Sequence, residues 1–222
     1  MEVVAGIYQI KGVANVYLVV DDDIMLIDTG LPGSSSKIIK YVKENLKRNP
    51  QDIKTIVITH HHFDHTGSLD KLKILSGAQV AAHSADAPYI SENKKPVEMG
   101  FMRYMVNLIK FIYRTKPVEI DILLNDGDVI NGYQVIQTPG HTPGSICLYN
   151  PQNKVLIVGD NLGYSKDKIV SPPANLLPEP EKYKKSMKKL ENLDVEVILS
   201  GHSPPVTNEA TSKLDEYLKD IN

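Results

Sequence analysis

The chain has 222 residues, of which 41% are hydrophobic, so it can bury one sizeable core. Because α/β folds of this length often form one domain, we predict a single domain over residues 1–222. The formal net charge of -2 provides no broad basic field that would attract a polyanion. We therefore expect no nucleic-acid partner.

The chain has one cysteine, Cys147, inside the apolar run SICLY. A lone buried thiol excludes an intrachain disulfide and is compatible with a reducing compartment. The N-terminal segment lacks the charged start and apolar core of a signal peptide. No uncharged apolar run approaches the roughly 18 residues that a membrane-spanning helix needs. We predict a cytoplasmic protein that acts on a small-molecule substrate and has no membrane partner.

Apolar runs typical of strands recur along the chain, and amphipathic helical patterns lie between several of them. In chain order the strand-like runs are VYLVV, IMLID, TIVITH, AQVAAH, YQVIQTPGH, SICLYN, KVLIVGD and VEVILSGH. Residues 34–49 and 178–193 space their apolar residues as helices do, and the serines that open the first segment are candidate N-caps. The alternation indicates an α/β protein.

Four of the strand-like runs end in a residue type that binds metal ions. His60, His141, Asp160 and His202 each follow the last apolar positions of a separate run, often beside a glycine that permits close backbone approach. If these strand ends converge on one rim, their side chains come together. The pattern therefore predicts a metal site.

The segment THHHFDHTG, residues 59–67, holds four of the seven histidines and one aspartate. In an extended chain His60 and His62 point to the same side and can bind one ion together. Asp64 and His65 follow at a predicted loop-to-helix junction, which can aim a second pair of ligands at a nearby position. This density of imidazole and carboxylate groups has no ordinary structural use and indicates metal binding.

Two other histidines have simpler interpretations. Alternation directs His61 away from His60 and His62, toward the surface or a supporting position. His83 is a strand-end residue near the predicted site. We predict neither as a metal ligand.

The hexapeptide HHHFDH matches the pattern H-x-H-x-D-H, and the chain resembles the metallo-β-lactamase superfamily over nearly its whole length. LIDTG, TPGHTPGS, VGD and SGH, at 26–30, 138–145, 158–160 and 200–202, are similar to the remaining motifs of that superfamily. The resemblance implies a four-layer αββα metallo-β-lactamase sandwich with two mixed β-sheets face to face. It also implies a dinuclear site where the strand-end loops meet.

The resemblance implies seven metal ligands in two groups that share one carboxylate. The first ion would have His60, His62 and His141, the second would have Asp64, His65 and His202, and Asp160 would bridge both. Asp28 has a plain turn-forming interpretation, whereas the resemblance makes it a residue that orients the ligand loop.

A ligand set of histidine and aspartate without cysteine suits two zinc ions and also accepts iron or manganese. Zinc lowers the pKa of bound water from 15.7 to about 7, so a metal-bridging hydroxide would be the nucleophile in a hydrolysis. We assign catalysis to Asp64 and Asp160 together with the ions. Tyr164 is a candidate hydrogen-bond donor to the substrate, with packing or surface exposure as the simpler interpretation.

Within that superfamily, the chain resembles the small stand-alone hydrolases with a glyoxalase II-like core. A short segment, residues 203–222, follows His202, whereas glyoxalase II uses a helical C-terminal domain to hold the glutathione part of its thioester. We predict a metal-dependent hydrolase of a small ester, thioester or lactone. A mononuclear iron oxidoreductase of the persulfide dioxygenase type, which shares this core, and a non-catalytic metal-binding protein stay open as alternatives.

Residues 85–118, between the second and third motifs, are predicted to be a helical insertion. From Phe101 to Tyr113, apolar residues recur at helical spacing. They are Met102, Met105, Val106, Ile109 and Ile112, with Arg103, Asn107 and Lys110 available for a polar face. This helix either covers the metal rim and lines an apolar pocket, or packs on the core or in a homodimer, with equal weight. A membrane-surface helix ranks third because the stretch is only modestly basic.

Overall fold

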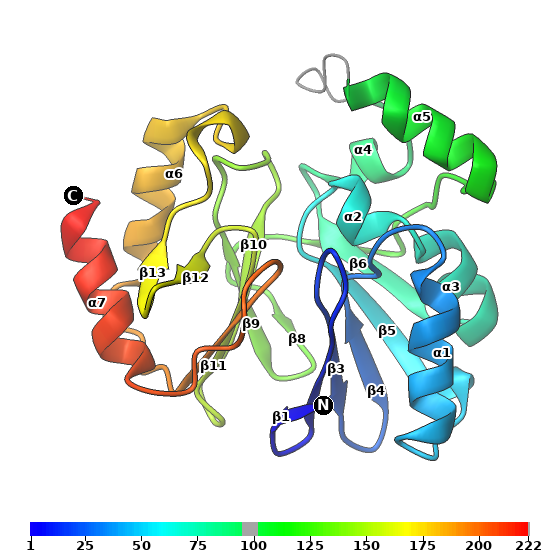
Figure 1. Ribbon diagram of the computed structural model, residues 1–222, viewed down its shortest axis with the longest axis horizontal. Helices are drawn as coiled ribbons and strands as arrows, with labels where there is room; N and C mark the ends of the chain where they lie inside the picture. Colours follow the sequence, from blue (N-terminus) through cyan, green and yellow to red (C-terminus); the bar gives the residue numbers. More distant parts are fainter. Residues whose placement is uncertain (95–101, 222) are drawn as a thin grey trace. The chain divides into compact units, whose positions relative to one another are not determined.

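The computed structural model describes residues 1–94 and 102–221, and the chain forms two compact units (Figure 1). Unit 1 comprises Met1–Ala82 and Asp86–Leu123, and unit 2 comprises His83–Ala85 and Leu124–Asn222. Each unit has a β-sheet, helices and a hydrophobic cluster of its own.

Unit 1 is built on a seven-stranded mixed sheet in the order β1-β2-β3-β4-β5-β6-β7. The first four strands pair antiparallel, whereas β4, β5 and β6 run parallel to one another. The strands are β1 (Glu2–Val4), β2 (Ile7–Ile10), β3 (Val16–Val20), β4 (Ile24–Ile27), β5 (Ile53–Ile58), β6 (Gln79–His83) and β7 (Ile122–Leu124). The last residues of β6 and β7 are assigned to unit 2.

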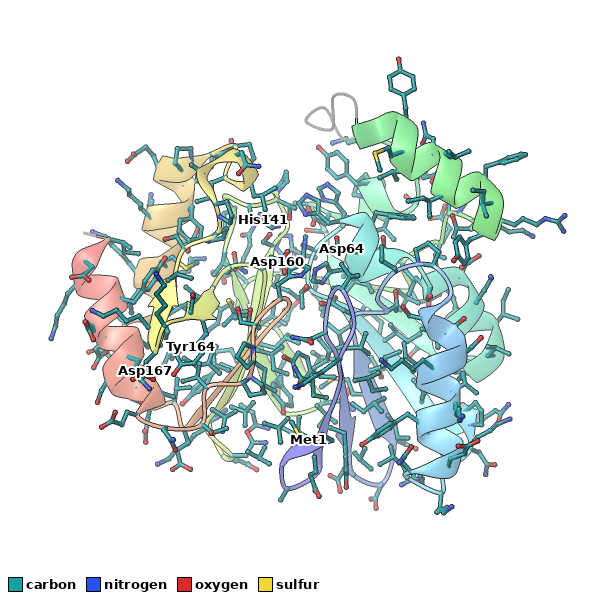
Figure 2. All side chains as sticks on the ribbon, viewed as in Figure 1. Met1, Asp64, His141, Asp160, Tyr164 and Asp167 are labelled. Carbon is teal, nitrogen blue, oxygen red and sulfur yellow. The ribbon has the colours of Figure 1, made fainter. Side chains whose placement is uncertain are left out.

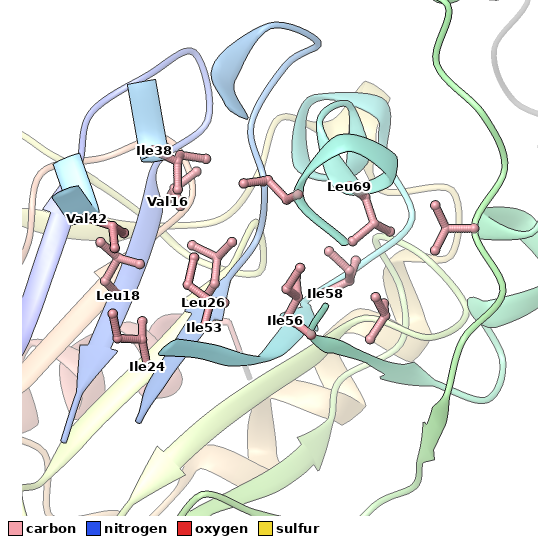
Figure 3. Close-up of a cluster of buried hydrophobic side chains, with 14 of the residues drawn as sticks. Val16, Leu18, Ile24, Leu26, Ile38, Val42, Ile53, Ile56, Ile58 and Leu69 are labelled. Atoms are coloured by element: carbon pink, nitrogen blue, oxygen red, sulfur yellow. The ribbon is translucent and has the colours of Figure 1, made fainter. Parts of the chain in front are cut away.

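Several helices of unit 1 pack on one face of its sheet, and all of them lie between β4 and β7 along the chain. They are α1 (Ser34–Glu44), the 3-10 turn η1 (Pro50–Asp52), α2 (Phe63–Thr66), α3 (Leu69–Ser76), α4 (Ala87–Ile90) and α5 (Met102–Tyr113). The four-residue spacing of Ile38 and Val42 places both side chains on one face of α1. Figure 3 shows them beside Leu18 and Leu26 of the sheet, with Leu69 of α3 in the same cluster.

The predicted serine N-cap of α1 is wrong. The helix begins after Gly33, whose φ of 91° lies in the left-handed region that favours glycine, and no side chain caps the first turn. Ser35 is instead inside the helix and buried, and its backbone N–H donates to Ser68 Oγ at 3.2 Å. The serine run therefore supplies a packing contact and not a cap.

Unit 2 is built on a five-stranded mixed sheet in the order β14-β11-β10-β9-β8. β11 and β14 are parallel, and the other neighbours are antiparallel. The strands are β8 (Val129–Ile130), β9 (Tyr133–Gln137), β10 (Ile146–Asn150), β11 (Val155–Gly159) and β14 (Val197–Ser200), with a separate hairpin of β12 (Gly163–Ser165) and β13 (Lys168–Val170).

The helices of unit 2 pack on its sheet through a second hydrophobic cluster. They are α6 (Pro180–Met187), η3 (Lys188–Leu190) and α7 (Ala210–Asp220), whereas the 3-10 turn η2 (Ala174–Leu176) has no buried residue. Met187 of α6 and Leu214 of α7 join this cluster with Val158 of β11. Helix α7 was not predicted from the sequence, whereas each of the eight strand-like runs forms a strand.

Across the described ranges, no helix combines the length and the apolar character that crossing a membrane requires.

Candidate metal centre

The donors of unit 1 lie in one short loop that leads from a strand into a helix. β5 ends at Ile58, His62 precedes the first residue of α2 with extended backbone angles, and Asp64 and His65 lie inside α2. The backbone N–H of His65 donates to the carbonyl of His62 at 3.0 Å. The ring centroid of His60 lies 4.7 Å from that of His62 and 4.1 Å from that of His65. The loop therefore gathers three imidazoles.

The carboxylate of Asp28, at the end of β4, holds this loop in place. Its Oδ1 accepts the backbone N–H of Thr59 at 2.8 Å. Its Oδ2 accepts the hydroxyl of Thr59 and Nδ1–H of His65, both at 2.8 Å. Asp28 has a φ of 59°, a left-handed conformation that aspartate tolerates better than most side chains. The orienting role that the resemblance implies for Asp28 corresponds to these contacts.

Thr59 extends the same hydrogen-bond chain to His60. Because the Thr59 hydroxyl donates to Asp28, its oxygen can accept from Nδ1 of His60, which lies 3.1 Å away. Nδ1 of both His60 and His65 is thus engaged by the protein. This arrangement assigns Nε2 as the nitrogen that would bind an ion, as is usual for metal-binding histidines.

His61 has different contacts from its neighbours. Its backbone N–H donates to Asp86 Oδ2 at 2.8 Å, and its ring Nδ1 lies 3.0 Å from the same oxygen. The ring stacks on Tyr89 of α4, with the centroids 4.5 Å apart and an interplanar angle of 17°. The ring centroid of His61 still lies 5.3 Å from that of His62, so the direction that alternation assigns to His61 stays a prediction.

A pocket of about 240 Å³ lies in unit 1 beside His62. Its wall contains apolar side chains of α4, α5 and the segment after α5, including Ile90, Val106 and Val118, and polar side chains that include Lys94 and Lys116. Helix α5 therefore borders the pocket next to a predicted metal ligand. Phe101, the predicted first residue of this helix, lies outside the described residues.

The donors of unit 2 come from three separate strand ends. His141 follows β9, Asp160 follows β11 and His202 follows β14. Asp160 Oδ2 lies 3.1 Å from Nε2 of His202 and 3.7 Å from Nε2 of His141. Figure 2 labels His141 and Asp160 at these strand ends. Nδ1–H of His141 donates to the carbonyl of Leu176 at 2.7 Å, which again assigns Nε2 to an ion.

Sheet topology explains why these three side chains meet. β11 and β14 are parallel neighbours, and β9 runs in the same direction because β10 is antiparallel to both β9 and β11. All three strands therefore end at the same edge. A Cβ added at Gly140 would lie 2.5 Å from Cα of Tyr183, so this glycine permits the close approach of α6 just before His141.

The two remaining candidates make contacts within unit 2. Nδ1 of His83 accepts the backbone N–H of Ala85 at 3.1 Å. The hydroxyl of Tyr164 donates to Asp167 at 2.5 Å and accepts from Lys213 at 3.2 Å (Figure 2). These contacts fit the simpler interpretation of Tyr164 as a surface residue.

Sequence reasoning did not find the residues that support the loop, namely Thr59, Asp86 and Tyr89. Thr59 directly precedes the histidine run, which was a usable signal. Asp86 and Tyr89 lie more than twenty residues away in sequence, and no pattern links them to His61.

Both units contain side chains that suit a divalent ion, with imidazole and carboxylate donors of the kind that zinc, iron and manganese accept. They are His60, His62, Asp64 and His65 in unit 1 and His141, Asp160 and His202 in unit 2. The hydrogen bonds to Nδ1 of His60, His65 and His141 orient three of these rings for binding through Nε2.

A mixed α/β fold with histidine and aspartate after its strand ends is typical of a class of metal-dependent proteins. The chain belongs to the metallo-β-lactamase superfamily, whose sequence model matches residues 10–202. The predicted fold class, α/β of the metallo-β-lactamase type with two mixed sheets, is confirmed. A metallo-β-lactamase family protein from Thermus thermophilus matches 99% of this chain and 80% of its own with a TM-score of 0.73 at 23% identity.

Two relatives are more similar in sequence. The probable metallo-hydrolase YflN of Bacillus subtilis is 30% identical, and the match covers 92% of this chain and 89% of YflN. The human acyl-coenzyme A thioesterase MBLAC2 is 32% identical, and the match covers 69% of this chain and 60% of the human protein. These relatives support a metal-dependent hydrolase.

Proposed function

We propose that the protein is a dinuclear metallohydrolase of small esters, thioesters or lactones. The observation that carries the proposal is the pocket of unit 1. Its wall contains His62, from the histidine loop between β5 and α2, together with apolar side chains of α4 and α5. An apolar wall beside a predicted metal ligand fits an acyl or alkyl group whose carbonyl lies at the ion. The volume of about 240 Å³ fits a small substrate better than a polymer.

In this proposal, the seven predicted ligands bind a pair of ions. The first ion has His60, His62 and His141 as ligands, the second has Asp64, His65 and His202, and Asp160 bridges the two. Support for this assignment comes from the order of the motifs along the chain and from the hydrogen bonds that orient the rings of His60, His65 and His141. We propose zinc in both positions, because imidazole and carboxylate ligands suit it.

Two bound divalent ions would acidify a water molecule and polarise the carbonyl of the substrate. The chain's own part is to orient the ligands and to place the acyl group. Asp28 fixes the ring of His65, and the carboxylates of Asp64 and Asp160 add negative charge beside the imidazoles. Val106, Ile90 and Val118 exclude water from one side of the pocket.

A thioester is one substrate class that a relative supports, because MBLAC2 is described as an acyl-coenzyme A thioesterase. Esters and lactones present the same acyl carbonyl to the pocket. The leaving group therefore distinguishes these classes and the acyl group does not.

The test combines metal content with a substrate panel of acyl esters, acyl thioesters, lactones and phosphodiesters. We expect two zinc ions per chain, turnover of at least one acyl substrate, loss of turnover on chelation and its return with added zinc. One iron per chain with oxygen consumption would favour the persulfide dioxygenase type instead. Two tightly bound ions without turnover of any acyl substrate would also contradict the proposal.

A further inference from the structure

Helix α5 has an exposed outer face that is apolar. Phe111 is 80% exposed and Leu108 is 59% exposed, although both are large apolar side chains. Five such residues share this face at spacings of three, four and seven, which place them on one side of a helix. They are Tyr104, Met105, Leu108, Phe111 and Ile112.

The opposite face of α5 is already occupied by unit 1. Val106 lines the pocket and Ile109 is half-buried. The ring of Tyr113 packs against Gly33, where an added Cβ would lie 3.0 Å from the ring. The pocket therefore accounts for one face of α5 and leaves the outer face unexplained.

The size and charge of the outer face fit a protein contact. At roughly 200 Å² for a large side chain, the five residues expose on the order of 600 Å². A standard interface buries about 800 Å² per partner, so this face would supply most of one. None of the five residues is charged, so a contact between two copies through this face would bury no unpaired charge.

We infer that this face is the contact surface of a homodimer in which α5 of one copy packs against α5 of a second copy. A two-fold axis brings the same surface of both copies together, so an apolar stripe on one helix is its own complement. The seven-residue repeats of Tyr104 with Phe111 and of Met105 with Ile112, on either side of Leu108, have the period of a helix–helix seam. In an antiparallel pair the two Leu108 side chains lie near the axis.

An anionic lipid surface is the competing occupant of this face. Residues 102–118 include four Lys or Arg residues and no Asp or Glu, so the segment is cationic. The exposed apolar area of this face approaches what one partner of a standard protein interface buries, so we assign the face to a second copy. Binding to vesicles is therefore an outcome that the experiment must separate from dimerisation.

The first experiment measures the mass of the full chain in solution by light scattering and sedimentation. We expect the native protein at twice its 24.7 kDa chain mass, and the double variant Leu108→Glu/Phe111→Glu as a monomer. The substitutions should weaken the dimer by about 100-fold or more, because they place charges at the centre of an apolar contact. Circular dichroism checks that the variant is folded.

Ile74→Glu is the matched control. Ile74 lies on α3 of the same unit and is 78% exposed, close to the exposure of Phe111, but it is not part of the outer face of α5. We expect this variant to stay dimeric. If both variants become monomeric, the effect is one of added charge and the inference is overturned.

A second experiment does not depend on a destabilising charge. Leu108→Cys should form a disulfide between copies under mild oxidation, whereas Ile74→Cys should not. Burial raises the pKa of the Cys147 thiol to about 12 and that side chain is fully buried, so the introduced thiol is the reactive one. A cross-linked dimer with Leu108→Cys supports the inference even if the glutamate variant fails to fold.

Three results would overturn the inference. The native protein could be a monomer at tens of micromolar, or the dimer could survive Leu108→Glu/Phe111→Glu unchanged. A monomer that sediments with phosphatidylglycerol vesicles and not with phosphatidylcholine vesicles would assign the face to anionic lipid instead. None of these results depends on whether the protein hydrolyses an acyl substrate.

Discussion

The two groups of candidate metal ligands are built in opposite ways. In unit 1, four donors lie within six residues of one loop, and Asp28 holds that loop through Thr59 and His65. In unit 2, three donors come from three strand ends that are far apart in sequence and meet because the strands end at one edge. The first group depends on local hydrogen bonds, whereas the second depends on the whole sheet.

The two groups also differ in exposure. The side chain of His65 is completely buried, whereas that of His202 is 41% exposed. A buried ring with a fixed hydrogen bond loses little freedom when it binds an ion, and an exposed ring loses more. Exposure therefore predicts graded effects for substitutions around the loop. The largest cost is expected at Asp160, because it is the proposed ligand of both ions.

The largest effect is expected for Asp160→Ala, because Asp160 is the proposed ligand of both ions. We expect loss of both metal ions and a fall in kcat/KM on the order of 10³-fold or more, comparable to removing a group that stabilises the transition state directly. Elemental analysis of the folded variant measures its metal content, and kinetics with acyl substrates measure kcat/KM.

Asp167→Ala is the control for this substitution. Asp167 is also a carboxylate of unit 2, but it pairs with Lys213 and Tyr164 at the surface. This variant should retain both ions. Retention of two tightly bound ions by Asp160→Ala would show that the carboxylate does not bridge.

The next effect concerns the support of the loop in unit 1. Asp28→Asn replaces a carboxylate that accepts from Thr59 and His65 with a neutral amide of similar size. Changes to such supporting groups cost about 10–100-fold in metal affinity, so we expect a loss in that range. Competition with a chromogenic chelator measures it.

Asp86→Asn is the matched comparison, because Asp86 is also buried and also accepts a backbone N–H of this loop at 2.8 Å. Its partner is His61, which is not a proposed ligand. We expect its metal affinity to change by less than about threefold. Equal losses in the two variants would mean that Asp28 acts only by holding the backbone.

The same contrast explains what the sequence could predict. The loop of unit 1 is recognisable because its donors are adjacent in sequence, so residue type and alternation indicate a metal site and separate His61 from His60. The donors of unit 2 are recognisable only as residues that follow apolar runs. Strand direction brings them together, and a single run does not encode direction.

Residues that act through long-range contacts could not be predicted. Tyr89 stacks on His61 because α4 lies beside the loop, and Leu176 accepts from His141 through a backbone carbonyl that any residue type would provide. The start of α1 at Gly33 was missed because serine is a good N-cap in general, whereas here Gly33 precedes the helix and Ser35 is buried inside it. Helical periodicity did identify α5, but spacing alone could not assign its two apolar faces.

A smaller effect is expected for the pocket wall. Val106→Asn places an amide where an apolar side chain lines the pocket, and one buried aliphatic side chain contributes about 1–2 kcal/mol. We expect kcat/KM to fall about 5–30-fold for the longer acyl substrates and less for acetyl esters, with metal content unchanged. Met105→Asn is the control. Met105 is next to Val106 in sequence, but it lies on the exposed face of α5 and not in the pocket wall. An equal loss for all chain lengths would contradict an acyl-binding role for Val106.

The smallest effect on the metal centre is expected for His61→Ala. The ring of His61 contacts Asp86 and Tyr89, and its centroid lies 5.3 Å from that of His62. Removal of a buried, stacked ring should lower the stability by about 1–3 kcal/mol, and each kcal/mol lowers Tm by roughly 2–4 °C in a chain of this size. Metal content should stay the same, whereas His62→Ala should lose metal.

His61→Phe then separates the two contacts of the ring. Phenylalanine can keep the stacking on Tyr89 but has no nitrogen near Asp86, so it should recover part of the lost Tm if stacking is the main contribution. If His61→Ala loses metal as severely as His62→Ala, His61 belongs to the ligand set and the alternation along this loop was assigned wrongly. If Tm falls and metal content does not, adjacent histidines of one loop have distinct roles, one in holding the loop to α4 and the others in binding the ion.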